Sequence, residues 1–299
     1  MSRIHDALKR AEQERASSMG THVEPSVEQP EIQNIPMPPM QAPGQSGMPS
    51  TFDLSYESLL ARCPQTIWHP DPLTMLFFDE DDKRIGTEEF RTLRSRLYQI
   101  REKMPLKRLL VTSALPKEGK SFVAANLAQV LVRQHGRRAL VIDADLRNPG
   151  MHRHLGTEQK PGLSEYLLGE CDEFAVLQRG QMEGLFFLPA GRIVGSAPEL
   201  LASGRLKLLL QRIEPMFDWI ILDSSPVIPV SDSTLVANVC DGILMVVRSN
   251  STPSDLARRA RAEFPDKLLL GVVLNGAPSG KLGQSKYYYG EAVSSQVRD

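Results

Sequence analysis

Two hydrophobic patterns alternate along the chain from about Leu76 onward. Short, nearly continuous apolar runs are typical of strands that are buried on both faces. They occur at residues 108–112, 138–143, 185–188, 219–223, 242–247 and 268–274. Stretches with helical spacing precede or separate these runs, at 86–103, 120–134, 197–213, 231–236 and 253–264. Strands separated by helices predict βαβ units, and therefore an α/β fold whose mostly parallel sheet has helices on both faces.

The N-terminal part of the chain lacks this alternation. Four apolar residues at helical spacing predict a short amphipathic helix over residues 1–18: Ile4, Ala7, Leu8 and Ala11. The sequence leaves open whether this helix docks on a partner, touches a membrane surface or is a solvated terminus.

A proline-rich stretch follows this helix. Seven prolines lie among Gln, Ser, Gly and Met between Thr21 and Ser50, and such a composition cannot pack a hydrophobic core. The last segment of the chain again loses apolar periodicity. The predicted organisation is a helix over 1–18, a largely disordered linker over 19–75, an α/β domain over 76–278 and a flexible tail over 279–299.

Composition narrows the possible functions. The 299 residues are 41% hydrophobic, and 35 Lys and Arg residues balance 36 Asp and Glu residues, for a net charge of -1. This balance argues against a nucleic-acid-binding protein, which usually carries a clustered basic excess. No apolar run approaches the ~18 residues of a membrane span. The start of the chain also lacks the apolar region of a signal peptide, so a cytoplasmic location is expected.

A phosphate-binding loop is the first candidate for chemistry. The sequence ALPKEGKS at residues 114–121 follows an apolar run and opens a helical stretch. Backbone N–H groups at such a helix N-terminus bind an anion. Lys120 is expected to reach the β- and γ-phosphates of a nucleotide, and the Ser121 hydroxyl to bind Mg²⁺. The loop predicts a P-loop NTPase-like fold and this nucleotide-binding set: Pro116, Lys117, Glu118, Gly119, Lys120, Ser121 and Phe122.

Two acidic motifs end predicted strands. LVIDADLR at residues 140–147 places Asp143 and Asp145 two positions apart, so a strand would direct both carboxylates to the same side. IILDSSP at residues 220–226 ends an apolar run at Asp223, which has the character of a Walker B acid. Alone, each motif is compatible with a solvated strand end. In this order after the phosphate loop, they indicate a nucleotide site at the carboxyl ends of the strands.

The ordered set of phosphate loop, LVIDADLR and IILDSSP resembles the bacterial tyrosine kinases (BY-kinases) of capsule and exopolysaccharide synthesis, of the CpsD/CapB type. The resemblance covers about Leu76 to Gly290. In the wider P-loop group, the residue at the position of Asn275 commonly contacts the adenine base. One further feature resembles the family's E-x-x-R-x-x-R oligomerisation motif: Glu88, Arg91 and Arg94. Another resembles its autophosphorylated tail: Tyr287, Tyr288 and Tyr289.

Roles follow from these motifs and from the needs of phosphoryl transfer, which are mainly positioning and charge neutralisation. The expected cofactors are ATP and Mg²⁺, and Ser121, Asp145 and Asp223 are expected to organise the metal. Asp143 is expected to accept the tyrosine proton as general base. An exchange of roles between Asp143 and Asp145 stays open. For Arg147, a phosphate contact, a subunit contact and a structural salt bridge are all open. The expected catalytic set is Lys120, Asp143, Asp145 and Asp223.

The resemblance also implies an assembly. It implies a ring of identical subunits in which one subunit's tyrosine tail reaches the next subunit's site. The implied partners are a membrane-bound polysaccharide co-polymerase, or chain-length determinant, that activates the kinase, and a tyrosine phosphatase. The kinase would then be recruited to the inner face of the plasma membrane through its partner.

Two other function classes compete with an autokinase. A switch ATPase of the MinD/ParA type binds and hydrolyses ATP without phosphotransfer, but it usually has a lysine where this loop has Leu115, and it lacks a tyrosine tail. A non-catalytic ATP-binding regulatory scaffold is the third class.

Overall fold

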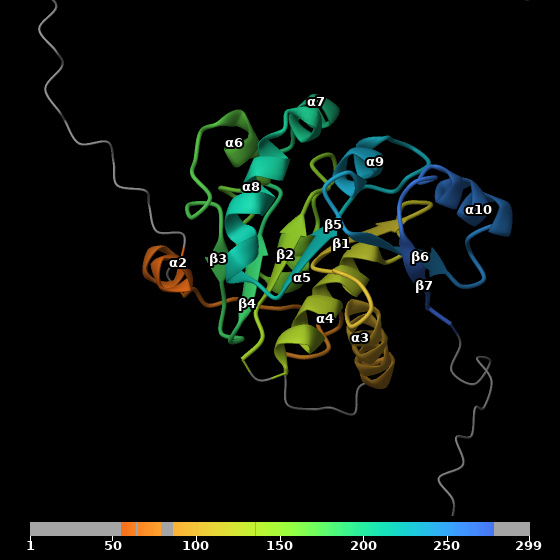
Figure 1. Ribbon diagram of the computed structural model, residues 1–299, viewed down its shortest axis with the longest axis horizontal. Coiled ribbons are helices and arrows are strands. Elements are labelled where there is room, and N and C mark those ends of the chain that lie inside the picture. Colours follow the sequence, from red (N-terminus) through yellow and green to blue (C-terminus); the bar gives the residue numbers. More distant parts are fainter. Residues whose placement is uncertain (1–54, 64, 79–85, 135, 278–299) are drawn as a thin grey trace, which may run out of the picture. The chain divides into compact units, whose positions relative to one another are not determined.

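A seven-stranded sheet in the order β3-β4-β2-β5-β1-β6-β7 forms the centre of the fold (Figure 1). The computed structural model describes residues 55–63, 65–78, 86–134 and 136–277. All neighbouring strands are parallel except the short edge strand β3, which is antiparallel to β4. The strands are β1 (Arg108–Ser113), β2 (Ala139–Asp143), β3 (Gln178–Arg179), β4 (Leu185–Leu188), β5 (Trp219–Asp223), β6 (Gly242–Arg248) and β7 (Leu269–Asn275). The predicted mostly parallel sheet is confirmed.

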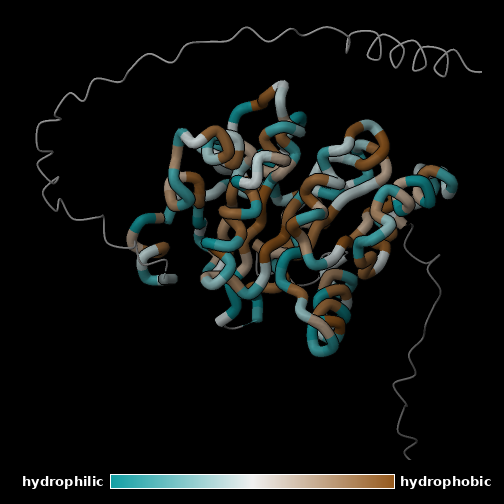
Figure 2. Tube along the Cα trace, turned by 45° about the horizontal axis from the view of Figure 1, so that its top comes forward, coloured by the Kyte–Doolittle hydropathy of each residue, from teal (hydrophilic) through white to brown (hydrophobic). Residues whose placement is uncertain are grey.

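Helices cover both faces of the sheet, as the sequence predicts, and two apolar clusters fill the space beneath them. One cluster packs the sheet against α3 (Thr87–Arg101), α4 (Lys120–Val132) and α5 (Met151–Leu155). The hydrophobic strands lie inside and the polar segments outside (Figure 2). The other cluster includes residues of α2 (Tyr56–Arg62), α6 (Leu163–Leu168), α7 (Ala197–Ala202), α8 (Arg205–Ile213), the 3₁₀ turn Glu214–Met216, α9 (Asp232–Ala237) and α10 (Ser254–Ala262).

One predicted helix is two separate helices in the structure. The apolar spacing over 197–213 predicts a single helix, but the structure breaks it into α7 and α8 at Ser203 and Gly204. Gly204 has φ = 79°, a left-handed conformation that glycine adopts without a steric penalty. The four buried apolar residues of α8 therefore face the core independently of α7: Leu206, Leu209, Leu210 and Ile213.

The folded domain begins earlier than the sequence predicts. Residues 55–75 were expected to belong to the linker, yet α2 begins at Tyr56, where the Ser55 side chain accepts a hydrogen bond from the Ser58 amide at 3.2 Å. Residues 65–78, here called the N-terminal strap, then contribute Trp68 and Met75 to the core. These apolar residues have neither helical nor strand periodicity, so only their burial reveals them as core.

The strap is fixed to helix α4 by side-chain amides. Asn126 Oδ1 accepts from the Leu76 amide at 2.8 Å, and Gln129 Oε1 accepts from the Phe77 amide at 3.2 Å. Both amide side chains are buried, and buried polar groups of this kind are stable only when their hydrogen bonds are made. The strap is therefore attached to the helix that follows the predicted phosphate loop.

Several expectations lie outside the described residues. They are the helix over 1–18, most of the linker and the tail with its tyrosines. Within the residues described, no helix has the length and apolar character needed to cross a bilayer.

Trp68 provides a test of whether the strap belongs to the folded domain. Its side chain is 1% exposed, and a Cβ on Gly180 would lie 2.5 Å from its Cδ2 atom. Trp68→Ala is expected to lower the free energy of unfolding by about 3–5 kcal/mol, because it leaves a large cavity. Ile67→Ala is the matched control, since Ile67 is 76% exposed and its truncation is expected to cost ~0.5 kcal/mol or less. Denaturant titration measures both, and equal losses would contradict this assignment.

Candidate active site

The predicted site residues meet at the carboxyl ends of three adjacent strands. The sheet order places β5 between β2 and β1. Asp143 at the end of β2 pairs in register with Asp223 at the end of β5, and Asp223 in turn lies beside Val111 of β1. The loop after β1 leads to Lys120 at the start of α4. This edge is where open parallel sheets bind their ligands.

The phosphate loop has the backbone conformation that its sequence requires. Lys117 and Gly119 both have positive φ values, of 63° and 95°. A Cβ at Gly119 would lie 2.0 Å from the Nδ2 atom of Asn275, so only glycine fits this position. That same Nδ2 donates to the Glu118 carbonyl at 2.9 Å. Asn275, at the end of β7, thus lies directly against the loop.

Two of the predicted nucleotide-binding residues, Glu118 and Phe122, have side chains that contact other parts of the fold. The Glu118 carboxylate accepts from the Leu115 amide at 2.8 Å and from the Thr252 hydroxyl, and so braces the loop. The Phe122 ring packs edge-on against Phe90 of α3, with ring centroids 5.8 Å apart. Both side chains are therefore engaged within the protein, and what remains for a nucleotide is the backbone of the phosphate loop.

Lys120 forms the positive centre of the site. Its Nζ lies 3.1 Å from Asp145 Oδ2, and both side chains are largely buried. Burial by itself lowers the pKa of Lys120, but the carboxylates of Asp223 and Asp145 outweigh burial and raise the pKa above its ordinary value. The ammonium group is therefore charged at every physiological pH.

Asp143 is fully buried and accepts only backbone hydrogen bonds. Its Oδ1 accepts from the Asp145 amide, and its Oδ2 accepts from the amides of Gly150 and Met151, each at 3.2 Å. Burial, together with the charge of Asp223, raises the pKa of Asp143 to about 7. The spacing of Asp143 and Asp145 predicts that both lie on one face of a strand. Strand β2 ends at Asp143, however, so Asp145 lies in the loop that follows.

Asp223 is a buried carboxylate whose oxygens accept no hydrogen bond from the residues that the structure describes. Burial raises the pKa of Asp223 to about 6, although the charge of Lys120 offsets part of the rise. Such a group is costly in an apolar interior, and a cation beside it would relieve that cost.

This donor set fits Mg²⁺. Among the described residues, no three His, Cys, Asp or Glu side chains are placed to hold a metal ion by themselves. Mg²⁺, however, usually takes one or two carboxylates and completes its shell with hydroxyl, water and phosphate oxygens. Ser121, Asp145 and Asp223 provide such an incomplete set beside the phosphate loop.

The expected oligomerisation stripe on α3 divides into two parts. Arg91 forms an ion pair with Glu88, whose side chain is 75% exposed. Arg94 instead donates to the Val130 carbonyl of α4 at 3.0 Å. Glu88 and Arg91 are thus at the surface, whereas Arg94 helps to hold α3 on the fold.

The sequence analysis did not identify the residues of β6 and of the following segment that hold the phosphate loop in place. Arg248 donates to the Lys117 carbonyl at 3.0 Å, and Thr252 bonds Glu118. Ser225, which donates to Asp145 Oδ1 at 3.0 Å, was also missed. Only the serine had a signal, because it lies two positions after the acid of the IILDSSP motif.

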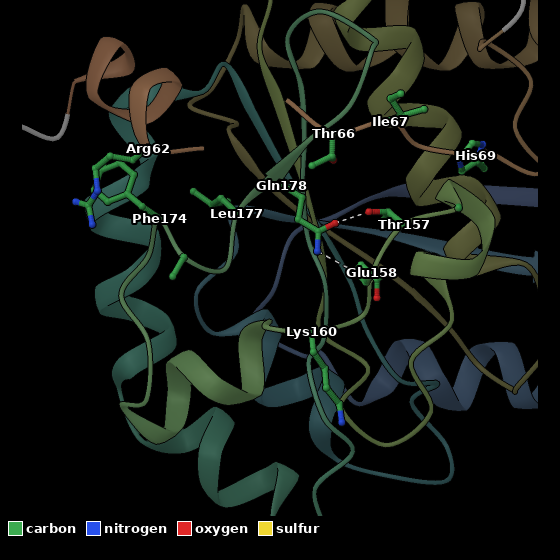
Figure 3. Close-up of a pocket in the computed structure, with 12 residues that line it drawn as sticks. Arg62, Thr66, Ile67, His69, Thr157, Glu158, Lys160, Phe174, Leu177 and Gln178 are labelled. Atoms are coloured by element: carbon green, nitrogen blue, oxygen red, sulfur yellow. Dashed lines mark hydrogen bonds between the residues drawn. The ribbon is translucent and has the colours of Figure 1, made fainter. Parts of the chain in front are cut away.

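A hollow of about 700 Å³ lies apart from these residues, between the strap and the segments around α5 and β3 (Figure 3). Gln178 lines the hollow, accepting from the Thr157 hydroxyl at 2.6 Å and donating to the Glu158 carbonyl at 3.0 Å (Figure 3). None of the phosphate-loop residues or the three aspartates lines this hollow. This hollow is therefore separate from the candidate active site at the strand ends.

Comparison with known proteins gives several relatives, although no family model matches the chain. It is 33% identical to tyrosine-protein kinase YwqD of Bacillus subtilis over 210 residues, which cover 70% of this chain and 88% of that protein. It is 38% identical to succinoglycan biosynthesis transport protein ExoP of Rhizobium meliloti over 59% of this chain but 23% of that protein. The kinase domain of Escherichia coli tyrosine kinase ETK matches 71% of this chain and 82% of that one, with 30% identity and a TM-score of 0.63.

A mostly parallel sheet, a phosphate loop and acidic residues at the neighbouring strand ends define a P-loop NTPase-like protein. The similarity to YwqD spans most of both chains. The chain therefore belongs to the bacterial tyrosine kinases, and its activity is that of a protein-tyrosine kinase.

Replacing Asp223 is expected to stabilise the protein in the absence of ligands. The pKa of about 6 in the folded protein exceeds the ordinary value of 3.8 for an aspartate, so the wild-type protein loses stability as pH rises from about 4 through 6. Asp223→Asn removes that loss and is expected to add on the order of 1–3 kcal/mol above pH ~6, and nothing near pH 4. Thermal melting at several pH values, without nucleotide or metal, measures the effect.

Asp241→Asn is the matched control for this experiment. Asp241 accepts from the amides of Lys107 and Arg108 and pairs with the Arg108 guanidinium at 2.9 Å. The same substitution should therefore destabilise the protein at this position, because it removes a satisfied charge. A destabilised Asp223→Asn variant at pH 8 would show that the Asp223 charge is already well compensated.

Proposed function

We propose that this chain is an ATP-dependent autokinase that transfers the γ-phosphate of ATP to the tyrosines of its C-terminal cluster. The observation that supports this most is the meeting of one buried ammonium, that of Lys120, with three buried carboxylates beside the phosphate loop. This combination suits phosphoryl transfer, because the reaction uses a cation to bind the phosphates, carboxylates to bind a metal ion and a carboxylate to accept a proton.

ATP is proposed to place its phosphates against the amides of loop 114–121. Lys120, now paired with Asp145, would exchange part of that contact for the β- and γ-phosphates. Ser121, Asp145 and Asp223 would hold Mg²⁺, which when bound neutralises phosphate charge. Asn275 lies against the loop, where the adenine contact of this family is expected.

Asp143 is proposed as the general base. A tyrosine hydroxyl with a pKa of ~10 stays protonated at neutral pH, so its attack is assisted by a carboxylate that accepts the proton. A pKa of about 7 leaves Asp143 partly ionised at neutral pH and basic enough for this task. The amides of Gly150 and Met151 hold the carboxylate in place while it takes up the proton.

The physiological process is proposed to be the polymerisation and export of capsular or exopolysaccharide. The name of ExoP, a succinoglycan biosynthesis transport protein, connects one relative with this process. A membrane-bound co-polymerase is proposed as the activator that recruits this chain to the inner membrane face, and a tyrosine phosphatase as the enzyme that reverses the reaction. Glu88 and Arg91, at the surface of α3, are proposed to join subunits into a ring.

Labelling with γ-³²P-ATP and Mg²⁺, in the presence of the activator's cytoplasmic tail, tests the proposed function. Alkali-stable label is expected on tyrosine, and it should fall about 10-fold or more when Tyr287, Tyr288 and Tyr289 are replaced by Phe, because the acceptor hydroxyls are gone. Tyr56→Phe is the control and should label normally. Phosphate release without labelling would indicate the switch ATPase, and nucleotide binding alone the scaffold.

Transfer between subunits is expected, because the proposed ring would bring the tail of one subunit to the site of the next. A Lys120→Met chain, which lacks the phosphate-binding ammonium, is mixed with an active chain of different size. Label should appear on the inactive chain, and disappear when that chain also carries the three Tyr→Phe substitutions. An unlabelled inactive chain with an intact tail would exclude transfer between subunits.

A further inference from the structure

Arg147 and Asp232 form a bidentate contact beside the site. Arg147 lies in the loop after β2 and donates through Nε to Asp232 Oδ2 at 2.7 Å and through Nη2 to Oδ1 at 3.2 Å. Asp232 is the first residue of α9 and is 1% exposed. The contact raises the pKa of Arg147 through its hydrogen bond with Asp232. Paired geometry of this kind fixes orientation as well as distance.

The next residue of α9 joins a cluster of buried hydroxyl groups. Ser233 Oγ donates to the Ser225 carbonyl and lies 3.2 Å from Ser224 Oγ. Thr112 of β1 donates to the same Ser225 carbonyl at 3.1 Å. All four side chains are buried, so these hydrogen bonds are not exchanged with bulk water. The cluster therefore fixes the backbone of Ser224 and Ser225, directly after Asp223.

The two contacts of α9, the Arg147–Asp232 pair and the hydroxyl cluster, each connect to a residue that hydrogen-bonds the Asp145 carboxylate or lies beside one that does. Ser225 Oγ donates to Asp145 Oδ1 at 3.0 Å, and the Asn148 amide donates to the same oxygen at 3.1 Å. Asn148 follows Arg147 in the chain. Lys120 occupies Oδ2 at 3.1 Å. The position of Asp145 thus depends on the loop that Arg147 holds and on the serine that α9 holds.

We propose that Asp232 is a positioning residue for phosphoryl transfer: by holding Arg147, it fixes the loop 144–150 and thereby the Asp145 carboxylate relative to Lys120 and Asp223. The proposal rests on the proposed function, since it gives Asp145 a role in binding the metal. Asp143, Asp145 and Asp223 repel one another, and Asp145 lies beyond the end of β2, where no strand pairing restrains it. A displacement of about 1 Å in such a group costs on the order of 100-fold in rate.

Asp232→Asn, Arg147→Gln and the double variant test this role in the full chain. Each single variant is expected to lower kcat for tail labelling by about 10- to 100-fold and to raise the Mg²⁺ concentration for half-maximal rate. The KM for ATP should change by less than about 3-fold, because the phosphate loop is untouched. The double variant should be no worse than either single variant, because both break the same contact. Arg147→Lys, which keeps the charge but not the fork, should recover part of the rate.

A matched control pair lies at the opposite ends of the same two strands. Arg137, before β2, and Asp218, before β5, form an ion pair of 3.1 Å. Arg137→Gln and Asp218→Asn should leave kcat and the Mg²⁺ response unchanged. If Asp232→Asn likewise lowers only the melting temperature, or if the losses of the two single variants multiply in the double variant, the positioning role is wrong.

Affinity for ADP with and without Mg²⁺ separates this proposal from the proposed function. If the wild-type chain labels no tyrosine, the proposed function fails. The positioning role still predicts that Mg²⁺ raises the affinity for ADP less in Asp232→Asn than in the wild-type chain. Asp218→Asn should respond to Mg²⁺ as the wild-type chain does. Should Asp232→Asn fail to fold, Ser225→Ala removes the other anchor of Asp145. An unchanged Mg²⁺ response in Ser225→Ala would then overturn the proposal.

Discussion

One buried ammonium group facing three buried carboxylates is the interaction on which the rest of this structure depends. Lys120 cannot neutralise Asp143, Asp145 and Asp223 together, and desolvation makes their mutual repulsion stronger. Asp143 is compensated by backbone amides, and Asp145 by an amide, a hydroxyl and the ammonium. Asp223 accepts no hydrogen bond from the described residues, and the charge of Lys120 offsets part of the cost of its burial. More acidic than basic groups therefore meet at this edge of the sheet, and a bound cation would reduce the cost of burying them together.

Parallel strands make this arrangement possible, because their carboxyl ends all lie at one edge. Strands β2 and β5 bring the aspartates, and β1 brings the phosphate loop. The outer strands contribute as well: Arg248 at the end of β6 and Asn275 at the end of β7 bond the loop backbone at Lys117 and Glu118. The sheet therefore defines both the chemistry and the stiffness of the site.

The N-terminal strap extends this support to the other side of α4. Asn126 and Gln129 attach the strap to the helix that begins with Lys120. Thr74 Oγ1 of the strap also lies 3.1 Å from His154 Nδ1 of α5, which follows the loop of Asp145. The segment that the sequence assigned to a linker is therefore in contact with two of the elements that carry the site.

The pattern of the sequence predicted the mostly parallel sheet with six of its seven strands, and the candidate site residues, because these depend on local periodicity and on short motifs such as ALPKEGKS. It did not predict the edge strand β3 or the short helices α2, α5 and α6, which have too few residues to show a period. Contacts between distant segments were decided only by tertiary structure. Nothing local marks Thr252 as the partner of Glu118, or Trp68 as core. The break at Gly204 depends on where α7 and α8 must pack. What stabilises the charge of an aspartate, three backbone amides at Asp143 and the ammonium of Lys120 at Asp223, depends on burial and on neighbours in space, because desolvation and charge act through space and not along the chain.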